Sequence, residues 1–192
     1  MSEKDDIKKR EILEWLKENF TGNFSVEFTS ENEIIINGNI RLDNYKMTRL
    51  KFPFAEINGN FKIGGDVFPS NGQVNYRSLN TLENCPRIVR GDFWCNSNQD
   101  LKSLKGGPIQ VKGRYRCNHC DLENLNGIAK EIGSWITAFG NRRLRDISAL
   151  EDVEIHKECD FEFADESLFQ TETYKKLKER NKIYISPPIR WD

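Results

Sequence analysis

Residues 79–141 read LNTLENCPRIVRGDFWCNSNQD, then LKSLKGGPIQVKGRYRCNHCD, then LENLNGIAKEIGSWITAFGN, which are three versions of one phrase. The phrases begin at Leu79, Leu101 and Leu122, and a fourth begins at Leu144, so the spacings are 22, 21 and 22 residues. A fixed period of this size is typical of solenoids, in which each repeat buries its apolar face against its neighbours. The stretch therefore predicts a stack of similar coils.

Each phrase places apolar residues at even-numbered offsets. Counted from the first Leu as zero, these are +10 (Val89, Val111, Ile132), +14 (Phe93, Tyr115, Ile136) and +16 (Cys95, Cys117, Ala138). Alternation with period two predicts a β-strand in each coil, and stacked coils bring equivalent strands together as one parallel sheet. Glycine recurs at +12, inside the strand, where it indicates a bend or a close approach of backbones (Gly38, Gly59, Gly91, Gly113).

The same offsets fit further coils on both sides of this stretch. We expect coils that begin at Val26, Met47, Leu79, Leu101, Leu122 and Leu144, the last with one residue inserted. The predicted fold class is an α+β repeat protein, a β-solenoid with one parallel sheet and about six coils of 21–22 residues.

A helix is expected at each end of this stack. Residues 3–20 carry an amphipathic pattern, with a capping-box-like Ser2 before it and Gly22 as its stop, and residues 166–181 form a second such pattern. Both would cover the open ends of the solenoid. We therefore expect a single domain over residues 1–192, with a helical cap at 1–22, coils at 23–164 and a C-terminal helix and tail at 165–192.

The position at +19 is Asn98, Cys120 and Asn141 in the three clear phrases. The run F-x-C-x-x-N followed by L-x-x-L resembles the leucine-rich repeat, and the fuller phrase resembles leucine-rich-repeat-like proteins of large tailed bacteriophages over residues 26–164. The resemblance implies that the Asn or Cys lies inside the turn and bonds neighbouring backbone, and that the protein binds rather than catalyses. The coils ending N-x-x-L are one residue longer than that pattern, and the Pro/Gly-rich return arm is too short for a helix.

The repeat is interrupted between Ile63 and Leu79, and the excess residues fall at 64–78. Insertions in repeat proteins map to loops, often on the binding face. Phe68 and Asn71, each next to a turn-forming residue, are candidate contacts of such a loop. The alternative is that the insertion is tolerated and has no function.

Trp191, in the C-terminal tail, either packs on the body of the protein or contacts a partner.

Composition narrows the functional classes. The net charge is −1, so the whole molecule has no strong field for long nucleic acid, and no run approaches the ~20 apolar residues of a membrane span. Five cysteines and an acidic, polar N-terminus favour a reducing cytoplasm over secretion, the host cytoplasm if the phage resemblance holds. We expect no membrane partner.

Sequence patterns for catalysis are weak. Cys117 and Cys120 have the spacing of half a zinc site, but Cys95 and Cys117 share the +16 core column and Cys120 the Asn column. We expect buried thiols there, with zinc or redox chemistry as the alternatives. Neither His119 nor His156 has the sequence context of a catalytic triad, and we find neither a Walker loop nor a GxGxxG fingerprint. We expect no enzyme, no metal and no cofactor.

The odd-numbered offsets should face outward, and there the middle coils carry cations and indoles. The candidate partner-binding residues are Arg90, Trp94, Lys112, Arg114, Arg116 and Trp135, and an acidic end follows at Glu154, Glu158, Asp160 and Glu162. Exposed Trp and Arg are typical anchors of protein interfaces. The leading hypothesis is a protein that binds, and inhibits, another protein through this face, with a host or defence factor as the partner if the phage resemblance holds. The alternative is a binder of a nucleotide or other phosphate-bearing ligand.

Overall fold

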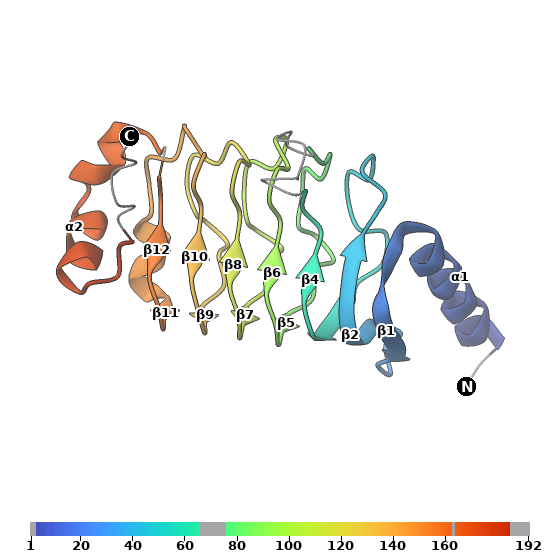
Figure 1. Cartoon of the computed structure of the whole chain (residues 1–192). Coiled ribbons are helices and arrows are strands. Elements are labelled where there is room, and N and C mark those ends of the chain that lie inside the picture. Colours follow the sequence, from blue (N-terminus) through green and yellow to red (C-terminus); the bar gives the residue numbers. More distant parts are fainter. Residues whose placement is uncertain (1–2, 66–75, 163, 185–192) are drawn as a thin grey trace, which may run out of the picture.

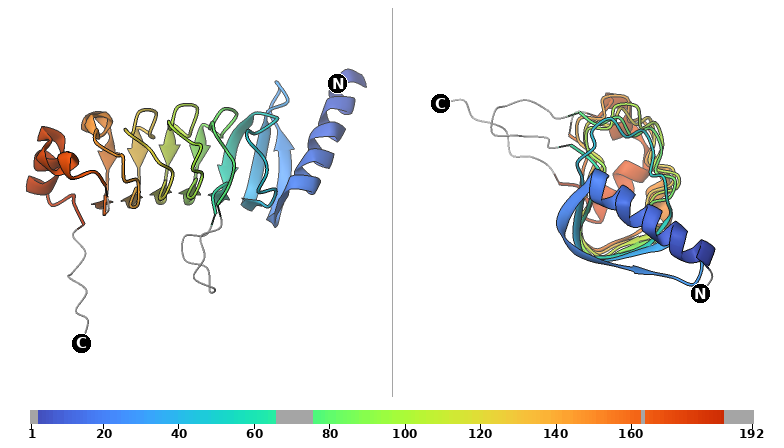
Figure 2. Two further views of the ribbon diagram at one scale, coloured as in Figure 1. Left: turned by 90° about the horizontal axis from the view of Figure 1, so that it is seen from above. Right: turned by 90° about the vertical axis from the view of Figure 1, so that its right-hand side faces the viewer.

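The computed structural model describes residues 3–65, 76–162 and 164–184. They form a parallel β-solenoid with a helix at each end (Figure 1). The view along the stack shows the coils superimposed in one outline, with α1 (Glu3–Asn19) crossing the first end (Figure 2). The fold class expected from the repeat is confirmed.

The N-terminal end is closed by α1 and a hairpin. Ile12, Trp15 and Leu16 are the apolar residues that α1 buries against the first layer. The chain then passes directly into β1 (Phe20–Phe28), which pairs antiparallel with β2 (Ile34–Leu42). The expected start of a coil at Val26 was therefore wrong, since that residue lies in a hairpin strand. Gly22 does not stop the helix either, but lies within β1 opposite Ile40.

The remaining strands are short and parallel. They are β3 (Phe54–Asn58), β4 (Phe61–Lys62), β5 (Ile88–Val89), β6 (Phe93–Trp94), β7 (Gln110–Val111), β8 (Tyr115–Arg116), β9 (Glu131–Ile132), β10 (Ile136–Thr137), β11 (Glu154–Ile155) and β12 (Cys159–Asp160). From β2 the 12-stranded sheet runs in two rows, through β3, β5, β7, β9 and β11 on one side and through β4, β6, β8, β10 and β12 on the other. The described chain makes about five turns.

Each coil after the first contributes two strands rather than the one expected. Each break includes the +12 position and the residue after it, and the +12 residue is glycine in the coils of β3, β5 and β7. A Cβ on Gly59 would lie 2.1 Å from the carbonyl oxygen of Gly38, and one on Gly113 would lie 2.7 Å from that of Gly91. A side chain at these positions would force the layers apart, so glycine allows the close approach in these coils, whereas Ser134 takes the +12 position in the coil that begins at Leu122.

The core consists of columns of equivalent residues, as the even offsets predicted. Phe61, Phe93 and Tyr115 occupy +14 in successive coils and are fully buried. Their rings form a continuous stack, with centroids 5.9 Å apart for Phe61 and Phe93 and 5.1 Å apart for Phe93 and Tyr115. Every layer therefore depends on its neighbours for burial, which is the property expected of a solenoid.

The +19 column lies inside the turn and bonds backbone, as the resemblance implied. The Asn98 side chain accepts a hydrogen bond from the Leu79 amide at 3.0 Å and donates one to the Cys95 carbonyl at 3.0 Å. Asn141 accepts from the Cys120 amide at 3.0 Å and from the Leu122 amide at 3.1 Å. These buried amides satisfy backbone groups that the turn would otherwise leave unpaired.

The C-terminal end differs from the single helix expected at 166–181. After the 3₁₀ helix η1 (Ser148–Asp152), the chain forms a second 3₁₀ helix, η2 (Glu166–Gln170), and then α2 (Glu172–Glu179). Thr171 separates them in an extended conformation, and its hydroxyl caps α2 by accepting from the Tyr174 amide at 3.3 Å. Because Thr171 is the N-cap of α2 and is extended, η2 ends before it and the two helices do not join.

Beyond α2 the chain returns to the sheet. The Cys159 amide donates to the Lys182 carbonyl at 2.7 Å, and the Tyr184 amide donates to the Cys159 carbonyl at 2.8 Å. This segment therefore adds a parallel bridge to the edge of β12. Ser2, Phe68, Asn71 and Trp191 lie outside the described residues, together with most of the 64–78 insertion.

Replacing Phe93 with Ala should test the column packing. The substitution removes a ring that is packed between two neighbouring rings, so we expect the free energy of unfolding to fall by about 3–5 kcal/mol. Lys105→Ala, at an exposed site on a return segment, should change it by less than about 0.5 kcal/mol. Urea denaturation measures both, and equal effects would contradict the assignment of Phe93 to the core.

Candidate interaction surface

The predicted outward columns exist and are in register. Lys62 pairs with Trp94, Trp94 with Arg116, and Arg116 with Thr137, so the +15 residues form one continuous file across β4, β6, β8 and β10. Arg114 immediately precedes β8 and lies beside Trp135, whose carbonyl accepts from the Tyr115 amide at 2.9 Å. The structure thus brings Trp94, Arg114, Arg116 and Trp135 to neighbouring positions.

Trp94 lies between two cations. The Lys62 ammonium is 5.5 Å and the Arg116 guanidinium carbon is 5.1 Å from the centroid of its ring. These residues come from the layers on either side of Trp94, so they cover opposite faces of the indole. A cation over the indole face is held by the ring quadrupole. The ring therefore presents its edge outward and offers no free face for a stacked base.

Arg90 and Lys112 are paired with acidic neighbours on the first row of strands. Arg90 Nε donates to the Asn58 side-chain oxygen at 2.9 Å and forms an ion pair with Glu56. Lys112 forms an ion pair with Glu131. Its hydrogen bond to Glu131, together with one from Gln110, lowers the pKa of that carboxyl. The charges of Arg90 and Lys112 are therefore largely compensated within the chain.

Arg114 and Arg116 are not paired in this way. The Arg114 side chain is exposed, and its guanidinium makes no hydrogen bond or ion pair with any residue in the described ranges; only its backbone amide bonds Asp92 Oδ1, at 2.8 Å. Arg116 is half-buried, and burial, followed by the charge of Arg114, lowers its pKa, with Asp92 opposing. We call Lys62, Trp94, Arg114 and Arg116 the basic strip.

The basic strip contains one residue that the sequence analysis did not select. Lys62 precedes Trp94 in the +15 column, so its register position was visible in the sequence. The contact of its ammonium with the indole was not, because the choice of side-chain rotamer decides it.

The first members of the +13 column stabilise the bend instead of facing a partner. Asn39 Oδ1 accepts from the Asn60 amide at 2.8 Å, and Asn60 Oδ1 accepts from the Asp92 amide at 2.7 Å. Together with the bond from the Arg114 amide to Asp92, these bonds form a ladder that runs from layer to layer. The ladder ends at Arg114, because a guanidinium group carries no acceptor atom for the next backbone amide. Asn39, Asn60 and Asp92, which were not among the candidate contacts, therefore serve the bend.

Trp135 is only half-exposed, because the C-terminal segment lies against it. Its ring makes an edge-to-face contact with Tyr184, with ring centroids 5.3 Å apart. Tyr184 itself is 38% exposed, so an aromatic pair rather than a lone indole lies at this position. The sequence could not show this contact, because the residues are 49 positions apart and belong to no common repeat.

The acidic end begins one layer beyond Trp135. Asp160 pairs with Thr137 in register and therefore continues the +15 file, and Glu158 continues the +13 file. Burial raises the pKa of Asp160, while its hydrogen bond from the Glu162 amide opposes the rise. We call Glu158 and Asp160 the acidic strip.

A shallow groove of about 390 Å³ lies beside the basic strip. It is lined by residues of β1, β2, β4, β6 and the first bend, both polar and apolar: Thr21, Gly22, Asn39, Ile40, Arg41, Asn60, Lys62 and Trp94. Arg41 is bonded to Asp43 at 2.9 Å, which compensates part of the positive charge.

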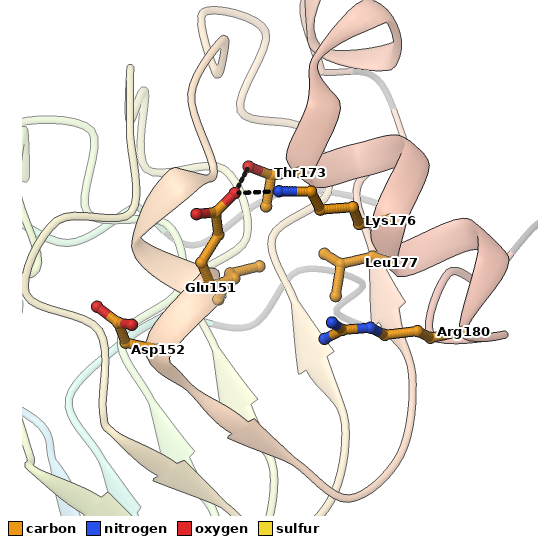
Figure 3. A pocket seen from close by; sticks show the side chains of 7 residues that line it. Glu151, Asp152, Thr173, Lys176, Leu177 and Arg180 are labelled. Carbon is orange, nitrogen blue, oxygen red and sulfur yellow. Dashed lines mark hydrogen bonds and ion pairs between the residues drawn. The ribbon is translucent and has the colours of Figure 1, made fainter.

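A second pocket, of about 280 Å³, lies between η1 and α2 (Figure 3). Glu151 accepts a hydrogen bond from the Thr173 hydroxyl at 2.9 Å and lies 3.5 Å from the Lys176 ammonium. The Thr173 bond and the Lys176 charge lower the pKa of Glu151. The contacts of Glu151 with Thr173 and Lys176 hold the C-terminal helix to the last coil.

The cysteines are buried, as their columns predicted. Cys95, Cys117 and Cys120 are completely buried, and Cys120 Sγ lies 3.0 Å from the Cys95 carbonyl oxygen. Burial raises the pKa of Cys95 and Cys117, and it raises that of Cys159 to about 12. Among the described residues no three His, Cys, Asp or Glu side chains are grouped so that they could hold a metal ion.

No family model, curated protein or solved structure matches this chain. None of the helices in the described part of the chain is long and apolar enough to span a lipid bilayer.

The burial of the thiols predicts that they are inert in the folded protein. Because a thiolate is the reactive form and burial disfavours it, we expect a chromogenic disulfide reagent at pH 8 to titrate no thiol rapidly under native conditions. All five cysteines should react in 6 M guanidinium chloride, the denaturing control. Rapid native reaction of Cys117 or Cys120, identified by peptide mapping, would contradict the core assignment.

Proposed function

We propose that the protein is a non-enzymatic binding protein that holds another protein against the second row of its sheet. The observation that carries the proposal is the basic strip, where Arg116 lies over the Trp94 ring and the exposed Arg114 precedes Arg116 by two residues. Arg and Trp are the residue types that most often anchor protein interfaces. By covering a functional surface of its partner, the protein would act as an inhibitor.

Covered indole faces favour a protein partner over stacked bases. Single-stranded nucleic acid is held by aromatic rings on which successive bases stack. Both faces of the Trp94 ring already carry a cation, and the Trp135 ring contacts Tyr184. The acidic strip would also repel a long phosphate backbone. The strip is suited instead to acidic side chains of a protein surface.

Comparative capture tests the proposal. Tagged wild-type protein, Arg114→Glu and Lys105→Glu would each be incubated with the same cell lysate and the bound proteins quantified by mass spectrometry. Lys105→Glu makes the same charge change at an exposed site on a return segment and is the matched control. We expect at least one protein to be retained by wild type and Lys105→Glu but lost with Arg114→Glu.

The affinity of that protein should then fall at least about 30-fold with Trp94→Ala, the effect of a hot-spot residue of ~2 kcal/mol. Identical capture by all three baits would exclude the basic strip as the binding site.

A second candidate function rests on the groove beside the basic strip. Lys62, Arg41, Asn39 and Asn60 line it, and such groups suit a small phosphate-bearing ligand, for instance a nucleotide whose base does not stack. We propose this as the alternative use of the surface.

Titration calorimetry with AMP, ATP and inorganic phosphate tests this alternative. Binding in the groove should weaken at least about tenfold with Lys62→Gln and should weaken as salt concentration rises, while Lys105→Gln leaves it unchanged. Binding that is the same in both variants would place the ligand elsewhere, and no heat with any of the three ligands would exclude a nucleotide site.

A further inference from the structure

Across three successive layers, the outward residues are positively charged on one side of the central layer and negatively charged on the other. Arg114 and Arg116 belong to the layer of β8, Trp135 and Thr137 to that of β10, and Glu158 and Asp160 to that of β12. The register is direct, since Thr137 pairs with Arg116 on one side and with Asp160 on the other. The central layer is uncharged, so one step along the stack in either direction gives opposite charges in the same file.

Such a pattern is self-complementary. Consider a second copy placed face to face, related by a two-fold axis that runs parallel to the strands above β10. The axis reverses the order of the layers but keeps each file opposite itself. Arg114 then faces Glu158 of the other copy, and Arg116 faces its Asp160. Both contacts occur twice, as an isologous interface requires.

The aromatic residues fit the same operation. Thr137 and Trp135 lie at the axis. Tyr184 continues the +15 file one layer beyond Asp160, because Ile183 forms a bridge with Cys159. Trp94 lies two layers before Thr137 and Tyr184 two layers after it, so the axis places their strand positions opposite each other, while the Tyr184 ring itself leans toward Trp135, with ring centroids 5.3 Å apart. Half-exposed Trp94 and Tyr184 are thus the outer aromatic contacts of the same face.

The charges involved lack full compensation within one chain. Asp92 is the carboxylate next to the Arg114–Arg116 pair, and it is engaged by the Arg114 amide. The Glu158 carboxylate has no hydrogen bond or ion pair with the described residues, and the neighbouring Lys182 ammonium donates to the His156 carbonyl at 3.4 Å. Asp160 is half-buried without a cationic partner in the described part of the chain, a position in which burial raises its pKa.

We propose that a second copy of this chain docks on the second row of strands through this two-fold axis, with Arg114 and Arg116 of each copy against Glu158 and Asp160 of the other. The inference does not depend on the proposed function, since it concerns the protein alone. It uses the same face, so the second copy and a partner protein would exclude each other.

Sedimentation equilibrium of the full chain tests the proposal directly. At about 25 mM salt the protein should be in a monomer–dimer equilibrium at micromolar concentrations. The dimer should dissociate as salt approaches about 0.5 M, because screening shortens the range of the charge contacts. Arg114→Glu should weaken dimerisation at least about tenfold, since it places like charges opposite each other at two symmetric contacts. Glu158→Arg should do the same for the same reason.

Mixing these two variants gives the decisive result. When the Arg114→Glu chain meets the Glu158→Arg chain, both contacts again join opposite charges, so a heterodimer should form with nearly the wild-type affinity. Lys105→Glu and Glu83→Arg carry matched charge changes on a return segment and should dimerise normally. Circular dichroism of each variant would establish that it is folded.

A monomer at every salt concentration would overturn the proposal. So would a dimer that is insensitive to both charge reversals, or a mixture of the two variants that stays monomeric. None of these three results would affect the proposed capture of another protein, because that is measured with a different molecule.

Discussion

The close approach of successive layers at the +12 bend determines the rest of the structure. A Cβ on Gly91 would lie 2.7 Å from the backbone of Gly59, so a side chain there would separate these two layers, whereas the layer of β9 and β10 has Ser134 at the same position. Because the layers stay in contact at the bend, side chains at +13 can reach the next backbone amide and side chains at +15 form a file with about 4.8 Å between neighbours. The alignment of Lys62, Trp94 and Arg116 is a consequence of this spacing, and so is the ladder that ends at Arg114.

The repeat made the columns predictable, because a fixed period and an alternation of two residues assign each position to the inside or the outside. It predicted the burial of Phe93 and Cys117 and the outward file of Trp94 and Arg116, and these were confirmed. It could not predict the hairpin of β1, since its residues follow no repeat and its pairing is antiparallel. The break at Thr171 was also missed, because a local N-cap there outweighs an amphipathic pattern that continues through it.

Whether an exposed cation can bind a partner depends on its ion pairs within the chain, and these do not follow from its position in the repeat. Arg90 and Lys112 occupy the same +11 file and each finds a carboxylate at +9 of a neighbouring layer, Glu56 or Glu131. An exposed ion pair of this kind contributes only about 0–1 kcal/mol to stability. Its larger effect is to neutralise Arg90 and Lys112 on the first row, so Arg114 and Arg116, on the second row, are the candidate arginines that form no ion pair with the described residues. The site is therefore narrower than the sequence pattern, and it lies beside an indole whose faces are already covered.

The two proposals for this face are linked by mass action. A partner protein that binds only the monomer must compete with the second copy, so its apparent affinity is reduced by the fraction of chains that are monomeric. That fraction rises with dilution and with salt, whereas salt also weakens an acidic partner's contact with Arg114 and Arg116. Under both proposals, the apparent affinity for such a partner passes through a maximum at intermediate salt when the protein is concentrated, and falls steadily with salt when it is dilute. A partner held mainly through the edge of Trp94 would show the rise without the fall, which separates apolar from charged recognition at the same site.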